Sequence, residues 1–369
     1  MLFYEKMEKD ILEIFDKFQK GIITLDDLRN FQEETYRNNI AYRLRVESED
    51  NYNFLRCEKY WILLLDLVNN RIDKNRIKEC VYRIKADDFI ERVKFSNVGT
   101  INQINQINKP IVYFDNNTYI YLKKYMPIEK INRKYQYVYS PAHLEELANS
   151  IRKNDFQYNE NVERDLHYLS KLTDNVEFLP DLNKGIIICC ESPDEPLKRV
   201  IKNFDGTVLS EQIEKDFLEK RKNLRDKYAL KVRGNNISGV LSSAAAEKGL
   251  KQFRWYQEYK EESNKRIFWE YYKNDYSFLF ESLTGLVNLL DILDNNPEPL
   301  KKYRSHLHDT THLIYATRSD LFVTNDKRLE DKANEIFRFL DIPVVVKNYN
   351  KFLESWGGST FKSEPFVFD

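Results

Sequence analysis

The chain has few of the features that mark a secreted protein, a redox-active protein or a protein with a structural zinc site. Only four of its 369 residues are cysteines, and because no two have CxxC spacing we expect neither a zinc ribbon nor a redox motif. Cys189 and Cys190 end the apolar run GIIICC, where small side chains are commonly buried. The lack of a disulfide pattern is typical of the reducing cytosol, so we expect a cytoplasmic protein.

Membrane and export signals are also lacking. The opening MLFYEKMEKDILEIF carries acidic residues and no small-residue cleavage site, so it does not resemble a secretory signal. The apolar run WILLLDLV is too short to span a bilayer and is interrupted by Asp66. We therefore expect no apolar stretch of membrane-spanning length and no membrane partner.

Two further absences narrow the functional class. Neither GxxxxGK[ST] nor GxGxxG occurs, which argues against an NTPase or a dinucleotide enzyme. The formal net charge is −1, so any nucleic acid must be held by a local basic surface or by a metal ion. The hydrophobic fraction of 42% is enough for a real core, in two modest domains or one enlarged domain.

Hydrophobic periodicity divides the chain into a helical part and an α/β part. Residues 1–108 place apolar residues three and four apart, which predicts an all-helical N-terminal domain for docking or packing. From Pro110, short β-branched runs alternate with helical stretches, as in an α/β domain with a central parallel sheet. The expected strands are IVYFD, YQYVYS, GIIICC, LFVTND and PVVV.

The boundaries of these parts follow from the same patterns. We expect the α/β domain at residues 109–350, with a large and almost wholly helical insertion at about 195–305. Residues 351–369 are expected to form a C-terminal tail.

Four acidic residues occupy positions where they could meet in such a domain. Asp115 and Asp326 directly follow strand-like runs, whereas Glu146 and Asp309 lie near the starts of helical patterns. Functional groups gather at the carboxyl ends of parallel strands, so these side chains are expected to lie together. Oxygen ligands favour Mg²⁺ or Mn²⁺, and such a cation would offset the repulsion among carboxylates.

At these residues the sequence resembles the PIN-like nuclease family, whose members share four scattered acids around one or two metal ions. The segments PIVYFDNNTYIYL, YSPAHLEELA, HLHDTTHLIYATRSD and LFVTNDKRL follow the family order over about residues 110–350. The resemblance implies a three-layer PIN-like domain whose four acids hold the metal and carry out catalysis, supported by Thr324 and Asn117. It further implies a metal-dependent endonuclease that prefers RNA to DNA, in a toxin, RNA-processing or antiviral defence role.

Ordinary structural roles compete with each of these assignments. Asp115 could cap a helix, Asp309 could simply favour the helix dipole, and Asp326 could be a turn residue. Glu145 competes with Glu146, because adjacent residues point about 100° apart on a helix and only one can face the site.

The segment HLHDTTH offers a different metal chemistry. His308 and His312 lie four residues apart, as in a zinc site, and His306 adds a third histidine, but Asp309 stands where a zinc protease has glutamate. A zinc hydrolase is therefore the weaker alternative. Asp320, a further acid, precedes its strand and is expected at the opposite edge of the sheet.

A different class of function, protein binding, involves no catalysis. A non-catalytic PIN-like module could use its N-terminal helices or its insertion to bind a protein partner. Four retained acids argue against this class, since a scaffold has no reason to bring like charges together.

The insertion carries the most basic stretch of the chain. Arg221, Arg225, Lys231 and Arg233 could follow a phosphate backbone, and the aromatic residues of LKQFRWYQEYKEESNKRIFWEYY could stack on exposed bases. Interleaved acids suggest a solvated helix instead, and aromatics at helical spacing usually form core. The sequence leaves both interpretations open.

Overall fold

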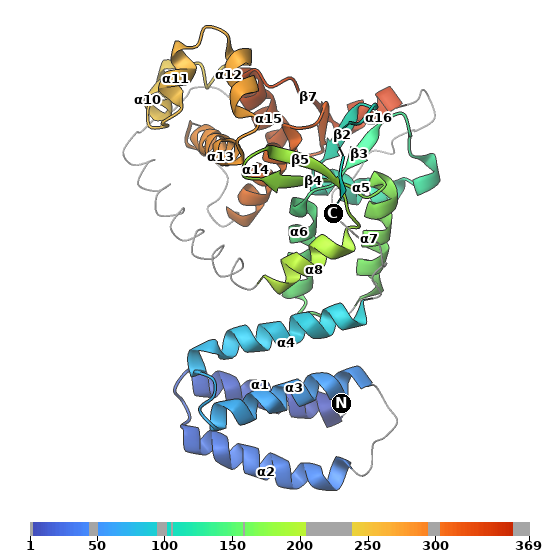
Figure 1. Ribbon diagram of the computed structural model, residues 1–369, viewed down its shortest axis with the longest axis vertical. Coiled ribbons are helices and arrows are strands. Elements are labelled where there is room, and N and C mark those ends of the chain that lie inside the picture. Colours follow the sequence, from blue (N-terminus) through green and yellow to red (C-terminus); the bar gives the residue numbers. More distant parts are fainter. Residues whose placement is uncertain are drawn as a thin grey trace. The chain divides into compact units, whose positions relative to one another are not determined.

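The computed structural model divides the chain into two compact units (Figure 1). The described residues are 3–43, 51–93, 102–104, 106–157, 159–203, 238–293 and 303–356. The first unit consists of Met1–Phe95, Ser150–Glu160 and Ile201–Thr207, and the second of Ser96–Asn149, Asn161–Val200 and Val208–Asp369. The first unit thus includes two segments from far beyond the boundary that the sequence places near residue 108.

The first unit is helical, as the sequence predicts for the N-terminus. Its helices are α1 (Phe3–Gln19), α2 (Leu25–Arg43), α3 (Asn51–Val68), the 3₁₀ turn η1 (Lys74–Arg76) and α4 (Ile77–Arg92). Its core contains the fully buried side chains of Ile11 from α1, Leu28 from α2 and Leu64 from α3. The apolar spacing of three and four residues therefore marks the faces that these helices turn towards one another.

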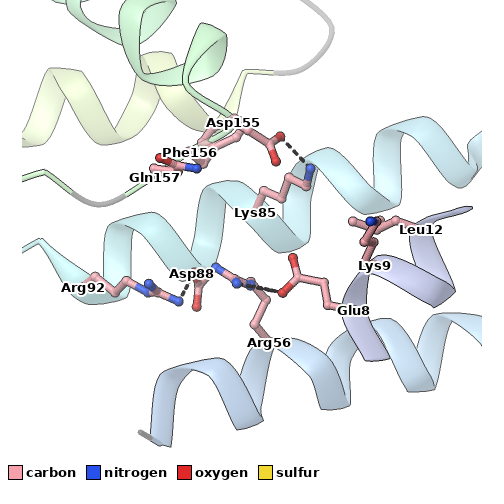
Figure 2. Close-up of a pocket in the computed structure, with 10 residues that line it drawn as sticks. All are labelled: Glu8, Lys9, Leu12, Arg56, Lys85, Asp88, Arg92, Asp155, Phe156 and Gln157. Atoms are coloured by element: carbon pink, nitrogen blue, oxygen red, sulfur yellow. Dashed lines mark hydrogen bonds and ion pairs between the residues drawn. The ribbon is translucent and has the colours of Figure 1, made fainter. Parts of the chain in front are cut away.

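Charged residues line a hollow of about 600 Å³ in this unit (Figure 2). Arg56 on α3 lies 2.7 Å from Glu8 on α1 and 3.1 Å from Asp88 on α4. Lys85, also on α4, lies 2.6 Å from Asp155. The lining is therefore a network of ion pairs that links α1, α3, α4 and the segment around residue 155.

The second unit is built around a four-stranded sheet in the order β3-β2-β6-β7, in which every neighbouring pair is parallel. Its strands are β2 (Ile111–Phe114), β3 (Gln136–Val138), β6 (Leu321–Thr324) and β7 (Val345–Asn348). The central strands β2 and β6 are almost wholly buried, which explains their continuous apolar sequences. The strands predicted at IVYFD, YQYVYS, LFVTND and PVVV are confirmed.

A second, antiparallel sheet has the order β1-β5-β4. It contains β1 (Asn102–Gln103), β4 (Val176–Asp181) and β5 (Gly185–Cys190). A parallel bridge between Tyr139, just after β3, and Glu177 on β4 connects the two sheets. The strand predicted at GIIICC is β5, whereas β1 and β4 were not predicted.

Helices cover both faces of the parallel sheet. The helices described from residue 116 onwards are α5 (Asn116–Tyr125), η2 (Ile128–Lys130), α6 (Pro141–Lys153), α7 (Glu160–Thr173), α8 (Asp194–Lys202), α10 (Ala244–Leu250), α11 (Tyr256–Glu261), α12 (Lys265–Tyr272), α13 (Tyr276–Leu293), α14 (Tyr303–Ala316), α15 (Lys327–Leu340) and α16 (Tyr349–Trp356). Successive side chains of β2 point to opposite faces. The Tyr113 ring packs 5.8 Å from that of His312 on α14, and the Phe114 ring packs 5.6 Å from that of Phe352 on α16.

The aromatic residues of the insertion form core. Trp255 and Trp269 are 7% and 2% exposed, and both belong to the hydrophobic cluster that also contains Tyr113 and Phe322 of the sheet. Tyr271 differs, since 76% of it is exposed. Most of these rings are therefore unavailable to nucleic-acid bases, and the core interpretation is correct for them.

Helix α13 is, among the described residues, the one helix long and apolar enough to cross a membrane by length and composition. The expectation that no stretch reaches that length is wrong for this helix. Leu283, Leu286 and Leu290 of α13 belong to the core around the sheet, and 56% of the apolar window is buried. Core helices commonly pass this test, so it is weak evidence for a membrane span.

Candidate functional site

Asp115 lies at the carboxyl edge of the parallel sheet, directly after β2. Its Oδ1 accepts the backbone N–H of Thr118 at 2.8 Å and caps α5, while its Oδ2 accepts the hydroxyl of Thr324 at 2.7 Å. Thr324 ends β6, so this bond connects two adjacent strand ends. The side chain is 2% exposed, and burial raises the pKa of Asp115 despite these donors.

Asp326 follows β6 at the same edge and caps α15. Its Oδ1 accepts the backbone N–H groups of Arg328 at 2.7 Å and Leu329 at 3.1 Å. Its own N–H donates to Thr324 Oγ1 at 3.0 Å. Thr324, expected as a supporting residue, thus contacts both Asp115 and Asp326.

Asp309 on α14 lies within electrostatic reach of both. Burial, followed by the negative charge of Asp326, raises the pKa of Asp309 to about 8, and Asp115 contributes in the same direction. His312 and Lys332 oppose this shift. The charges of Asp115 and Asp326 therefore both act on Asp309, beside the carboxyl ends of β2 and β6.

Glu146 on α6 is neutralised differently, by a histidine. Its Oε1 lies 3.0 Å from His312 Nε2, and its Oε2 accepts Asn116 Nδ2 at 2.5 Å. Burial would raise the pKa of Glu146, but His312 outweighs burial and holds it below its usual value. Burial likewise acts to lower the pKa of His312, but Glu146 outweighs it and raises that pKa. The two side chains therefore form a buried ion pair.

The choice between Glu145 and Glu146 follows from these contacts. Glu146 makes the bonds to His312 and Asn116, whereas the charge of Glu145 acts on Tyr276 and Tyr315. Glu146 is therefore a residue that contacts the buried groups of the site.

A chain of buried polar groups continues behind His312. The Tyr113 hydroxyl lies 2.8 Å from His312 Nδ1 and 2.6 Å from Ser140 Oγ. The Ser140 N–H donates to His143 Nδ1 at 3.2 Å, and His143 Nε2 lies 3.1 Å from the carbonyl of Phe114. Since a carbonyl only accepts, Nε2 carries the proton and His143 is neutral. Burial and His312 lower the pKa of His143 to about 3.

The buried polar residues around His312 were not predicted as part of the site. The sequence puts His312 on the helical face of Asp309, three residues away, but suggests a role for it only as a zinc ligand in the alternative interpretation. Tyr113 and His143 adjoin Asp115 and Glu146 in the same way, two and three residues before them. Proximity of polar residues to expected site residues is the signal that could have identified them.

The other expected residues make different contacts. Asn117 is exposed on α5, and its neighbour Asn116 makes the bond to Glu146. Asp320 lies at the opposite edge, as predicted, where its Oδ2 accepts the N–H of Ile111 at 2.8 Å. His308 Nε2 lies 3.1 Å from Asn149 Nδ2.

Some expected residues cannot be placed. The cations Arg221, Arg225, Lys231 and Arg233 lie outside the described residues, as does the side chain of His306. Their roles stay predictions.

The aspartates of the site carry only oxygen donors. Within the described ranges, no three His, Cys, Asp or Glu side chains form a ready metal-binding group. Asp115, Asp309 and Asp326 nevertheless supply only oxygen donors, which favour Mg²⁺ or Mn²⁺ over zinc. A cation near Asp309 would favour the charged form that burial and Asp326 disfavour.

Comparisons of the chain with protein-family models, curated proteins and solved structures found no match. The class that the fold defines is a mixed α/β protein with a parallel four-stranded sheet and a helical N-terminus. A functional assignment beyond this class depends on the geometry described above.

Proposed function

We propose that this chain is a metal-dependent nuclease with a three-layer, PIN-like core. The observation that carries the proposal is that Thr324 joins Asp115 and Asp326 at one buried sheet edge, where the charges of both also act on Asp309. Two of these acids, Asp115 and Asp326, are fixed by Thr324. Carboxylates brought together in this way cost stability unless a proton or a cation compensates them.

Asp115, Asp309 and Asp326 would hold Mg²⁺ or Mn²⁺, with Glu146 as the fourth acid. A divalent cation there would make water more acidic and offset negative charge on a scissile phosphate. The protein itself holds the acids: Thr324 orients two of them, and His312 with Asn116 fixes the carboxylate of Glu146. Resemblance to the PIN-like family favours RNA over DNA and a toxin, RNA-processing or defence role.

Cleavage assays with labelled single-stranded and duplex RNA and DNA, in Mn²⁺ or EDTA, test the proposal. We expect cleavage in Mn²⁺ only, and a loss of at least about a hundredfold in Asp309→Asn and Asp326→Asn, because several kcal/mol of charge stabilisation disappear. Asparagine also caps helices well, so the fold should survive at position 326. Asp341→Asn is the matched control, since Asp341 is exposed and has the left-handed backbone that asparagine tolerates.

Two outcomes would favour other functions. Equal and negligible cleavage by the wild type and all three variants, on every substrate, would favour a non-catalytic assembly module. Zinc that co-purifies at one equivalent and is lost in both His308→Ala and His312→Ala would favour a zinc hydrolase.

A further inference from the structure

A hollow of about 420 Å³ lies in the second unit between the C-terminal end of α5, the turn after it and α7. We call it the α5–α7 groove. Its lining includes Lys124, Tyr125, Arg164, His167 and Lys171. Four of the eleven residues that line it are lysine or arginine, although the chain as a whole is slightly acidic.

Buried contacts fix the two helices that form the groove. The Tyr168 hydroxyl on α7 donates to the carbonyl of Met126 at 3.1 Å, and the Tyr119 hydroxyl on α5 donates to that of Asp165 at 2.7 Å. Lys123 pairs with the Asp165 carboxylate at 2.5 Å. The groove is therefore preformed, and the charge of Lys123 is already compensated.

The remaining charge of the lining is positive. With Lys123 paired to Asp165, the cations Lys124, Arg164 and Lys171 are opposed in the lining by Glu129. Arg164, His167 and Lys171 are spaced three and four residues apart, so they share one face of α7. Val162, Leu166 and Leu169 are buried on the other face, which leaves the basic face exposed.

An aromatic ring accompanies these cations. Tyr125 is 42% exposed, and Lys124 Nζ lies 4.9 Å from the centre of its ring. An exposed ring beside cations matches a single-stranded nucleic acid, which presents phosphates and unstacked bases together. Duplexes and acidic peptides do not offer this pairing.

The exposed face of α5 connects the groove to the acidic edge of the sheet. The helix starts after Asp115 and contains 10 residues, so it is about 15 Å long. Asn117, Ile120 and Lys124 are exposed and share one face of this helix. A strand in the groove could follow this face to Asp115.

We propose that the α5–α7 groove binds the phosphate backbone of single-stranded RNA, with Tyr125 stacked on a base. The direction of the strand towards Asp115 rests on the nuclease function proposed above, whereas binding in the groove does not. Lys124, Arg164 and Lys171 contact phosphates, and Tyr125 supplies affinity that depends little on salt.

Fluorescence anisotropy with labelled oligouridine in EDTA, over a salt series, tests binding without cleavage. The groove variant combines Lys124→Gln, Arg164→Gln and Lys171→Gln. Its matched control combines Lys184→Gln, Lys248→Gln and Arg254→Gln, which are exposed cations of the same unit outside the groove. The slope of log K against log salt is negative. We expect it to become less steep by about 2 in the groove variant only, since each phosphate contact contributes about 0.7 to its magnitude.

Tyr125→Leu should weaken binding at least about fivefold without changing the slope, because it removes stacking and no charge. The proposal is overturned if both triple variants bind alike, if Tyr125→Leu binds like the wild type, or if duplex RNA binds more tightly than oligouridine. A wild type that binds through the groove yet cleaves nothing in Mn²⁺ supports the groove and contradicts only the proposed nuclease.

Discussion

At the scale of single residues, the acidic residues Glu177 and Glu191 lie close together where β3, β4 and β5 meet. Glu177 on β4 is fully buried, and Glu191 follows β5. Arg199 binds both carboxylate oxygens of Glu191, at 2.7 and 2.6 Å. Burial and the charge of Glu191 raise the pKa of Glu177 to about 8, against the opposing charge of Arg199. Glu177 therefore keeps its proton at neutral pH.

The retained proton makes stability depend on pH. Between the unfolded pKa of about 4.3 and the folded value of about 8, only the folded state holds this proton, so unfolding free energy falls as pH rises. Glu177→Gln should remove part of this loss. The free energy of unfolding of the variant should therefore rise relative to that of the wild type from pH 6 to pH 9. Urea unfolding in EDTA measures the difference.

The matched control is the exposed Glu354→Gln, which should follow the wild type. Asp309 contributes in the same direction, since its folded pKa is also about 8, so the Glu177→Gln variant retains some pH dependence. Identical pH profiles for Glu177→Gln and wild type would contradict the assignment.

Local sequence patterns predicted the positions of Asp115 and Asp326 at strand ends, but not the long-range contacts of the other site residues. Asp115 and Asp326 follow apolar runs, so their place at the sheet edge follows from the chain itself. The partners of Glu146 and Tyr113 lie 166 and 199 residues away at His312. Such pairs depend on tertiary packing, which helical spacing within one segment does not encode.

At the scale of elements, the turn between β4 and β5 depends on a glycine. Gly185 has φ +72°, and a Cβ there would lie 2.5 Å from the carbonyl oxygen of Lys273, at the end of α12. The hairpin therefore packs directly on the backbone of the insertion. Both its conformation and its close approach exclude a side chain.

Alanine substitutions distinguish the cost of backbone strain from the cost of the close approach to Lys273. Gly21→Ala, at φ +68° with nothing within 4 Å of the added Cβ, should cost about 1–2 kcal/mol from backbone strain alone. Gly185→Ala should cost clearly more, because the Lys273 backbone must also move. Urea unfolding free energies compare the two variants. Equal losses would mean that the close approach contributes nothing.

The buried central strands β2 and β6 could be predicted from their own sequences. Runs such as LFVT carry their own signal, because both faces of a central parallel strand are apolar. VEFLPD forms β4 although it contains Glu177, Pro180 and Asp181, since its pairing with β5 and its burial come from tertiary structure. Likewise, helical spacing of aromatics could not distinguish core from a binding face.

At the scale of the whole molecule, the helical unit is completed by later parts of the chain. The Tyr82 hydroxyl on α4 donates to the carbonyl of Ile201 at 2.7 Å and accepts Arg152 Nε at 2.8 Å. Lys85 pairs with Asp155. A cut after the N-terminal helices would remove the partners of α4.

A fragment of residues 1–95 tests this dependence by hydrogen exchange. We expect amides of α4 to exchange at least about tenfold faster in the fragment than in the full chain, since lost hydrogen bonds cost about 1–3 kcal/mol. Amides around Ile11 and Leu64, in the core of α1 and α3, serve as the internal control and should change less. Equal protection of α4 in both proteins would show that the first 95 residues suffice.

The interleaving of the two units also limits how the gene can evolve. The chain passes from one unit to the other at five points, after Phe95, Asn149, Glu160, Val200 and Thr207. Recombination that exchanges a domain ordinarily moves one continuous coding segment. Here neither unit is one continuous segment, so a segment long enough to encode the whole of one unit also encodes part of the other.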